Sequence, residues 1–110
     1  SGLEVAKKTT STSASTAPLI LSKPDYLQPP AQPRYPARSK RRGEQGTVWL
    51  RILLDSAGAI KNLMVKSSSG FDLLDKSALE AAGKWKFKPA VVDGSGRDAW
   101  LEVPVHFKLR

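Results

Sequence analysis

The fold is decided by residues 47–55, which read Thr47-Val48-Trp49-Leu50-Arg51-Ile52-Leu53-Leu54-Asp55. Every second residue is apolar, so Val48, Leu50, Ile52 and Leu54 share one side, while Thr47, Trp49, Arg51 and Asp55 lie on the other. Alternation with a period of two is typical of a β-strand that buries one face. This stretch therefore predicts a half-buried strand at the centre of the domain.

The residues that follow predict a hairpin. Asp55-Ser56-Ala57-Gly58 reads as a tight turn with glycine in the left-handed position. A second strand is expected over residues 59–67, but its apolar residues change phase between Ile60 and the pair Leu63 and Val65. One extra residue in a strand shifts the phase in this way, so we expect a bulge near Lys61 and Asn62.

The end of the chain predicts a third strand over residues 99–109. Its apolar side is Leu101, Val103, Val105, Phe107 and Leu109, and its other side is Trp100, Glu102, Pro104, His106 and Lys108. Because proline has no N–H for a ladder, Pro104 indicates an edge strand. A long free edge invites a further strand, and an extended peptide could be added there through its backbone. The alternative is that Pro104 blunts the edge against such pairing.

Two helices complete the expected fold. Tyr35-Pro36 opens a short helix over residues 37–42, and Gly43 ends it. Asp72 is expected to cap a second helix, in which Leu74, Ala78, Ala81 and Trp85 recur at helical spacing. Residues 91–98 are expected to form a flexible loop. The order helix-strand-strand-helix-strand predicts an α+β domain, with two helices packed on one face of a three-stranded antiparallel sheet. Residues 19–21 are apolar enough to add a short strand.

The composition of the chain predicts two segments without a core of their own before the domain that begins at residue 34. Residues 1–17 are rich in serine and threonine and show no apolar periodicity, which predicts a disordered linker. Residues 18–33 hold five of the eight prolines, which predicts an extended segment. Residues 34–110 are expected to form the domain.

Catalysis and cofactor binding are not expected. The chain has no cysteine and one histidine, His106, which alternates with apolar residues on a strand. Asp72 and Asp75 are explained by the start of a helix, and the remaining carboxylates are scattered along the sequence. A metal site would need ligands beyond one histidine. The pattern favours a domain that binds other proteins.

Two groups of residues leave both a structural and a functional interpretation open. The basic cluster is Arg34, Arg38, Lys40, Arg41 and Arg42, within a net charge of +8. It is either a solvated helix end or a surface that docks on an acidic partner. Trp49 and Trp100 lie on the polar side of their strands, where they mark an interface or form a cross-strand aromatic pair. Trp85 and Phe87, by contrast, are expected in the core.

Taken together, residues 29–110 resemble the C-terminal domain of the TonB family. The resemblance rests on the order and spacing of six short sequence motifs. They are Gln32-Pro33-Arg34-Tyr35-Pro36-Ala37-Arg38, Gly43-Glu44-Gln45-Gly46-Thr47-Val48, Asp55-Ser56-Ala57-Gly58-Ala59-Ile60, Ser67-Ser68-Ser69-Gly70 followed by Leu74-Asp75, Trp85-Lys86-Phe87-Lys88-Pro89-Ala90, and Val103-Pro104-Val105-His106-Phe107.

The resemblance implies an energy transducer of Gram-negative bacteria. Such a protein is anchored in the inner membrane and crosses the periplasm. It carries force from the ExbB–ExbD motor complex to outer-membrane transporters for iron complexes, haem or cobalamin. Its C-terminal domain captures the TonB box of the transporter, which pairs with the last strand. The implied partner-binding residues here are Gln32, Pro33, Arg34, Tyr35, Arg38, Trp100, Glu102, Val103, Pro104, Val105, His106, Phe107 and Lys108.

Two other functions remain open from the residues alone. A TolA-like periplasmic interaction domain has a similar architecture, although the Tyr35-Pro36 and Trp85-Lys86-Phe87 motifs favour TonB. A nucleic-acid-binding module is suggested by charge alone, and it would bind with a steep dependence on salt. The nutrient that is served, and a role dedicated to one nutrient such as haem, do not follow from the sequence.

Overall fold

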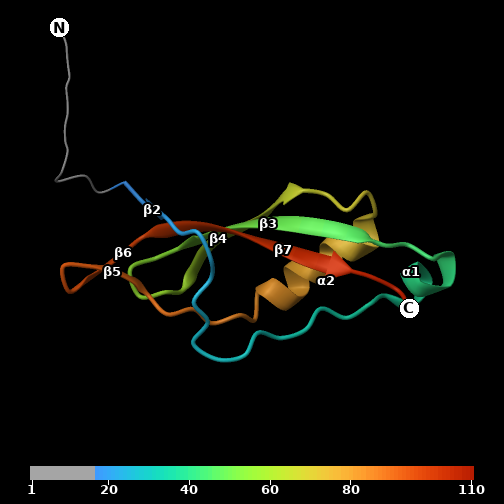
Figure 1. Ribbon diagram of the computed structural model, residues 1–110, viewed down its shortest axis with the longest axis horizontal. Coiled ribbons are helices and arrows are strands. Elements are labelled where there is room, and N and C mark those ends of the chain that lie inside the picture. Colours follow the sequence, from blue (N-terminus) through green and yellow to red (C-terminus); the bar gives the residue numbers. More distant parts are fainter. Residues whose placement is uncertain (1–16) are drawn as a thin grey trace, which may run out of the picture.

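The computed structural model describes residues 17–110 (Figure 1). Within that range the chain forms an α+β domain with two helices, a mostly antiparallel four-stranded sheet and a small hairpin. In chain order the elements are β2 (Leu19–Ile20), α1 (Ala37–Arg42), β3 (Gly46–Leu54), β4 (Ile60–Ser67), α2 (Asp72–Ala82), β5 (Ala90–Val92), β6 (Ser95–Arg97) and β7 (Ala99–Phe107). The sheet has the order β2-β7-β3-β4, and β5 pairs with β6.

The centre of the sheet is the antiparallel pair β3 and β7. Their register runs from Gly46 opposite Phe107 to Leu54 opposite Ala99 without interruption. The alternation expected for both strands is confirmed, because the apolar residues of each are buried on the same face. α2 packs across this face (Figure 1). The buried core consists of Val48, Leu50, Ile52, Leu54, Leu74, Ala78, Ala82, Trp85, Phe87, Leu101, Val103, Val105 and Phe107.

The hairpin between β3 and β4 forms as expected. The carboxylate of Asp55 accepts hydrogen bonds from the backbone N–H groups of Ala57 and Ala59, each at 2.9 Å, and Gly58 has a φ of +89°. Leu54 lies opposite Ile60 and Leu53 opposite Asn62, so Lys61 is the extra residue of a bulge. The expected bulge is confirmed, and it accounts for the phase change in β4.

The three expected strands are joined by a fourth, the short strand that the apolar residues 19–21 allowed, which lies at the start of the Pro-rich segment and pairs with β7. β2 runs parallel to β7, with Leu19 opposite Ala99 and Ile20 opposite Trp100. The backbone N–H of Leu19 donates to the carbonyl of Asp98 over 2.9 Å, and that of Leu21 donates to Trp100 over 2.8 Å. The edge of β7 is therefore covered at its start.

The position of α1 corrects the expectation that both helices cover one face of the sheet. α1 lies beyond the end of the sheet, beside the C-terminus (Figure 1). It has the expected bounds and ends at Gly43, which has a φ of +69°, but its one buried residue is Ser39. A helix without an apolar stripe has nothing to pack against the sheet face. α2 is the helix that closes the core.

Two further expectations are wrong in detail. Residues 91–98 are not a featureless loop, because β5 and β6 form a hairpin whose turn residues Asp93 and Gly94 have φ values of 52° and 82°. An Asp-Gly pair with two positive φ angles suits the twist of a two-residue hairpin. β7 ends at Phe107 instead of Leu109, because the backbone N–H of Leu109 donates to the side chain of Gln45 over 2.8 Å.

The start of α2 also differs from expectation. Phe71, not Asp72, occupies the N-cap position, and Asp75 holds the preceding loop. The carboxylate of Asp75 accepts from the backbone N–H of Ser69 over 3.0 Å and from its hydroxyl over 2.8 Å, and the Ser68 hydroxyl donates to it as well. Burial opposes the charged form, but these hydrogen bonds outweigh it and hold the pKa of Asp75 below its ordinary value.

The Pro-rich segment runs along the domain from β2 to α1 (Figure 1). The ring of Tyr26 stacks on Phe87 at 5.1 Å and meets Trp85 edge-on at 5.7 Å. The expected disordered linker lies outside the described residues, apart from Ala17, and stays a prediction. No helix within residues 17–110 is long and apolar enough to cross a lipid bilayer.

Candidate functional site

The outer edge of β7 presents free backbone groups. In a strand, the N–H and C=O of one residue point to the same side, and those of the next residue point to the other. The carbonyls of Asp98 and Trp100 accept from β2, so the even-numbered residues of β7 point outward. β2 ends at Ile20, and the outward groups of Glu102, Pro104 and His106 therefore lie beyond its cover.

Pro104 shapes this edge. Its missing N–H would have pointed outward, so its presence removes no hydrogen bond between β7 and β3. The edge that remains has two N–H donors, from Glu102 and His106, and three carbonyl acceptors, from Glu102, Pro104 and His106. This is an incomplete ladder that a second strand can pair with, but with one bond fewer than a regular edge.

The predicted site residues of β7 divide into two sets. The side chains of Val103, Val105 and Phe107 are buried in the core, and their backbone groups point toward β3, so they support the edge from behind. The side chains of Trp100, Glu102, Pro104 and His106 lie on the opposite face of the sheet and are half-buried or exposed. His106 bonds the Thr47 hydroxyl through Nδ1 at 3.0 Å, and Lys108 is exposed beyond the end of the strand.

The fold brings the Pro-rich segment to this edge. A hollow of about 280 Å³ lies between the two, lined on one side by Tyr26, residues 30–33 and Trp85, and on the other by residues 103–106. The indole N–H of Trp85 donates to the carbonyl of Ala31 over 2.9 Å and holds the segment in place. Gln32 and Pro33, some seventy residues away in sequence, therefore face the outer edge of β7.

The next two predicted residues lie elsewhere. The ring of Tyr35 meets Phe107 edge-on at 5.4 Å, and its hydroxyl donates to the backbone carbonyl of Glu44. Burial, followed by the charge of Glu44, raises the pKa of Tyr35. Tyr35 thus ties the Pro-rich segment to the end of the sheet. The carbonyl of Arg34 accepts from the Ser77 hydroxyl, and Arg34 lines a hollow on the α2 side of the molecule.

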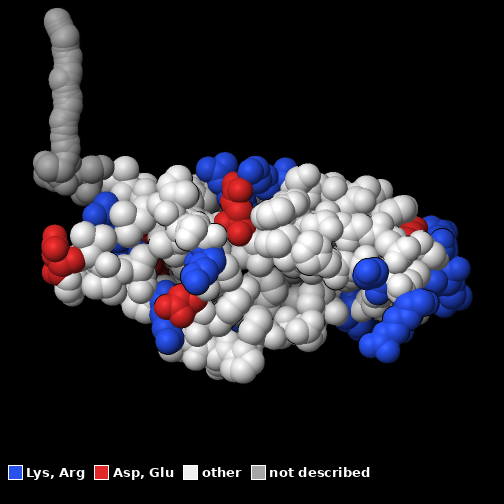
Figure 2. All heavy atoms as spheres, in the orientation of Figure 1, with Lys and Arg blue, Asp and Glu red and all other residues white. Residues whose placement is uncertain are grey.

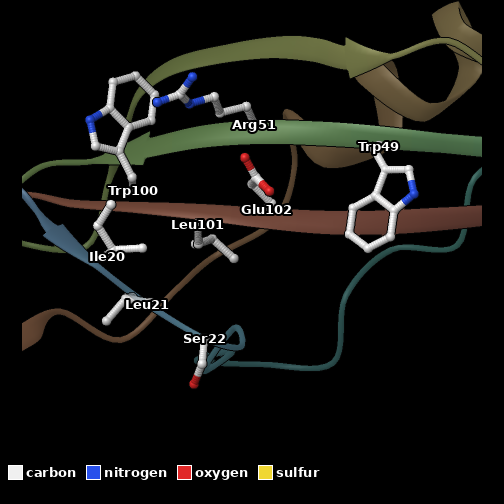
Figure 3. Close-up of a pocket in the computed structure, with 8 residues that line it drawn as sticks. All are labelled: Ile20, Leu21, Ser22, Trp49, Arg51, Trp100, Leu101 and Glu102. Atoms are coloured by element: carbon white, nitrogen blue, oxygen red, sulfur yellow. The ribbon is translucent and has the colours of Figure 1, made fainter.

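A second hollow, of about 260 Å³, lies where β2 leaves the edge, and its lining residues are Ile20, Leu21, Ser22, Trp49, Arg51, Trp100, Leu101 and Glu102 (Figure 3). Trp49 and Trp100 stand at opposite ends of it, with Arg51 and Glu102 between them (Figure 3). The sequence interpretation missed Ile20 and Ser22, because nothing in residues 18–22 indicates that this segment reaches the edge of β7.

Trp49, which is exposed, and Trp100, which is half-buried, do not form a cross-strand pair. Trp49 lies opposite Pro104, and Trp100 lies opposite Leu53, so their registers keep them apart. The guanidinium of Arg51 lies 4.5 Å from the centre of the Trp100 ring, which is a cation–π contact. Lys66 Nζ forms an ion pair with Glu102 Oε1 at 2.9 Å. Of the two interpretations left open, the aromatic pair is wrong.

Cationic side chains gather at one end of the molecule, over α1 and the C-terminus (Figure 2). We call the exposed residues Arg38, Lys40, Arg41, Arg42, Lys108 and Arg110 the basic end. In the part of the chain that the structure describes, its one ion pair with an acidic side chain is between Arg42 and Glu44, at 3.9 Å. The basic end lies next to the C-terminal end of β7, and so it adjoins the free edge.

Known proteins are similar to this chain in sequence and in fold. The family described as Gram-negative bacterial TonB protein C-terminal matches residues 31–109. Protein TonB of Vibrio cholerae is 41% identical over 92 residues, and Protein tonB2 of Pseudomonas aeruginosa is 43% identical over 84 residues. These matches cover 84% and 76% of this chain but 38% and 31% of the two relatives. The solution structure of the Pseudomonas aeruginosa TonB CTD matches with a TM-score of 0.60 and 28% identity, over 80% of this chain and 86% of that one.

Proposed function

The chain belongs to the family of TonB C-terminal domains, and from this premise we propose that it is the receptor-binding domain of a TonB-type energy transducer. It captures the TonB box of outer-membrane transporters by strand addition to β7. It then passes force from the inner-membrane motor to the transporter. The cargo classes are those of the family: iron complexes, haem or cobalamin.

The free outer edge of β7 is the observation that carries this proposal. Glu102, Pro104 and His106 present backbone donors and acceptors that β2 does not cover. The Pro-rich segment faces them across a hollow of about 280 Å³. A strand that is added here gains its affinity from ladder hydrogen bonds, which read the backbone and tolerate varied side chains.

Strand addition also suits the transmission of force. A peptide that pulls along the strand loads its ladder bonds together, so they must break together. Each bond contributes only about 1 kcal/mol net, and Pro104 leaves this edge one donor short. A box peptide alone is therefore expected to bind weakly. Contacts of Gln32, Pro33 and the basic end with the rest of the transporter would supply further affinity.

The other partners lie outside this chain. The family places such a domain in the periplasm, at the end of a protein that is anchored in the inner membrane and driven by ExbB–ExbD. We propose the same location and the same motor here, reached through a segment upstream of residue 1. The family match favours this role over that of a TolA-like interaction domain.

The test is a titration of the ¹⁵N-labelled domain with synthetic TonB-box peptides from several transporters. Under this proposal the amide signals of Glu102 and His106 shift most, and those of Leu101 and Val103, which point toward β3, shift less. A peptide of the same composition in scrambled order serves as the control. Shifts confined to α1 and α2, with the signals of β7 unchanged, would contradict strand addition.

A further inference from the structure

β2 shows where a strand sits on the outer edge of β7. Ile20 lies opposite Trp100, and the N–H of Leu21 still donates to the Trp100 carbonyl. If the same parallel register continued, Ser22 would lie opposite Glu102. The chain instead turns away, and the side chain of Ser22 points away from β7 (Figure 3). The hollow of about 260 Å³ lies at this break in the row.

The geometry of a sheet decides which side chain would enter this hollow. Residues that lie opposite each other on neighbouring strands place their side chains on the same face. Glu102 shares its face with Trp100, Arg51 and Trp49 (Figure 3). A residue that an added strand sets opposite Glu102 therefore projects onto this face, next to Ile20. The argument holds for a parallel and for an antiparallel partner.

The chemistry of the lining decides what kind of side chain fits. Its charged groups already have partners, since Arg51 lies over the Trp100 ring and Glu102 binds Lys66. The large apolar side chains of the lining stay accessible: Ile20 is 81% exposed and Trp49 is 40% exposed. A large apolar side chain set between them would cover more of this apolar surface than a small one, and burial of apolar area is favourable in proportion to that area. A carboxylate would approach Arg51 but would meet Glu102 as well.

We propose that this hollow, formed by Ile20, Trp49, Arg51, Trp100 and Glu102, is a specificity subsite for one large apolar side chain of the strand that pairs with β7. The inference rests on the proposed strand addition. The subsite adds a side-chain preference to an edge that otherwise recognises a partner strand through its backbone alone. Ile20 and Trp49 are the specificity-determining residues, and Arg51 and Glu102 form the floor.

A host–guest peptide series tests the subsite. The probe is acetyl-Thr-Gln-Val-Xaa-Val-Gln-Thr-amide, in which Xaa is leucine, alanine or aspartate and is the one variable side chain on its face. Amide shifts of Glu102 and His106 give the dissociation constant for each guest. We expect the leucine peptide to bind about tenfold more tightly than the alanine peptide, which corresponds to about 1.4 kcal/mol. The aspartate peptide should bind no better than the alanine peptide. Contacts between the leucine methyl groups and the Trp49 ring should appear in nuclear Overhauser spectra.

Variants of the domain locate the preference. Ile20→Ala and Trp49→Ala, made separately, should each reduce the preference for leucine over alanine to about threefold or less. Met64→Ala is the matched control, because Met64 is 41% exposed on β4 and does not line the hollow. It should keep the tenfold preference. Amide spectra of each free variant report whether its fold survives, and the guest series on the unaltered domain needs no variant.

The outcomes separate the subsite from the proposed function. Equal binding of the leucine and alanine peptides, with Glu102 and His106 still shifted, would overturn the subsite and leave strand addition standing. Tighter binding of the aspartate peptide would replace the apolar subsite by an anion site at Arg51. Loss of the Leu19 and Leu21 hydrogen bonds on binding would mean that the peptide displaces β2, which removes the Ile20 wall and overturns the proposal. If no peptide shifts the β7 amides, strand addition fails and the subsite fails with it.

Discussion

The indole N–H of Trp85 donates a hydrogen bond of 2.9 Å to the backbone carbonyl of Ala31. Trp85 follows α2 and belongs to the core, whereas Ala31 belongs to the Pro-rich segment. One side chain thus contributes to the core and also positions the wall that faces the outer edge of β7. A change at Trp85 should therefore affect both the stability of the domain and the shape of its candidate site.

Replacement of Trp85 by phenylalanine should loosen that wall. Trp85→Phe keeps an aromatic ring in the core but removes the donor, so the free energy of unfolding should fall by about 1–3 kcal/mol, since some packing is lost as well. Backbone relaxation should show increased motion at Ala31 and Gln32. Tyr26→Phe is the control, because it keeps the rings that pack on Trp85 and Phe87. Unchanged relaxation at Ala31 in Trp85→Phe would mean that the hydrogen bond does not position the segment.

A proline at position 106 should weaken peptide binding and spare the fold. The N–H of His106 points to the outer edge, so His106→Pro removes no backbone hydrogen bond to β3. It does remove the side-chain hydrogen bond between His106 Nδ1 and the Thr47 hydroxyl, which His106→Ala removes as well. One lost hydrogen bond of about 1 kcal/mol predicts about fivefold weaker binding of a box peptide. His106→Ala, which keeps the N–H, should bind within about twofold of the parent domain. The measurement is an amide-shift titration of each variant, with thermal unfolding as the check on the fold. Unfolding of His106→Pro would mean that this amide serves the sheet.

Charge reversal at the basic end should slow binding to a transporter. Arg38 and Arg41 are exposed on α1, so Arg38→Glu with Arg41→Glu should leave the fold intact. Charges at the rim of an interface act mainly on the association rate, which we expect to fall about tenfold at low salt and to approach the parent value at high salt. Lys84→Glu with Lys86→Glu carries the same change in net charge at exposed positions elsewhere. If both double variants lose the same amount, net charge and not the basic end is responsible. Surface plasmon resonance with a purified transporter gives the rates.

Asp75 should make stability depend on pH. Because its pKa is lower in the folded domain than in the unfolded chain, its contribution is present above the unfolded pKa of about 4. That contribution is lost as the pH falls through the folded value. Asp75→Asn should therefore lower the free energy of unfolding by about 1–2 kcal/mol at pH 7, and by progressively less below about pH 4. Asp72→Asn, in the same turn of α2, should change it by about 0.5 kcal/mol or less. Urea unfolding at several pH values measures both, and a pH-independent difference for Asp75→Asn would refute the assignment.

Local patterns in the sequence predicted the elements that rest on local physics. Alternation identified the buried faces of β3 and β7, a phase change identified the bulge at Lys61, and Pro36 and Gly43 bounded α1. These features depend on side-chain period and on the φ angles that single residues allow. The Asp93-Gly94 hairpin carried a local signal as well, but the glycine-rich run around it was interpreted as a loop.

The candidate site, in contrast, depends on contacts between distant segments. The sequence of β7 determined that its even-numbered residues share one face and that Pro104 offers no donor. It could not show that the backbone N–H and C=O groups of these residues point away from β3. That follows from the register between β3 and β7 and from the two backbone hydrogen bonds that the β2 segment donates. Nor could it place Gln32 and Pro33 beside β7, since Trp85 and Tyr26 hold that segment through tertiary packing. The sequence by itself determined the buried faces of β3 and β7, because their burial follows a local period. Only the tertiary structure decided which edge is open and what faces it, because those depend on where segments far apart in the chain come to rest.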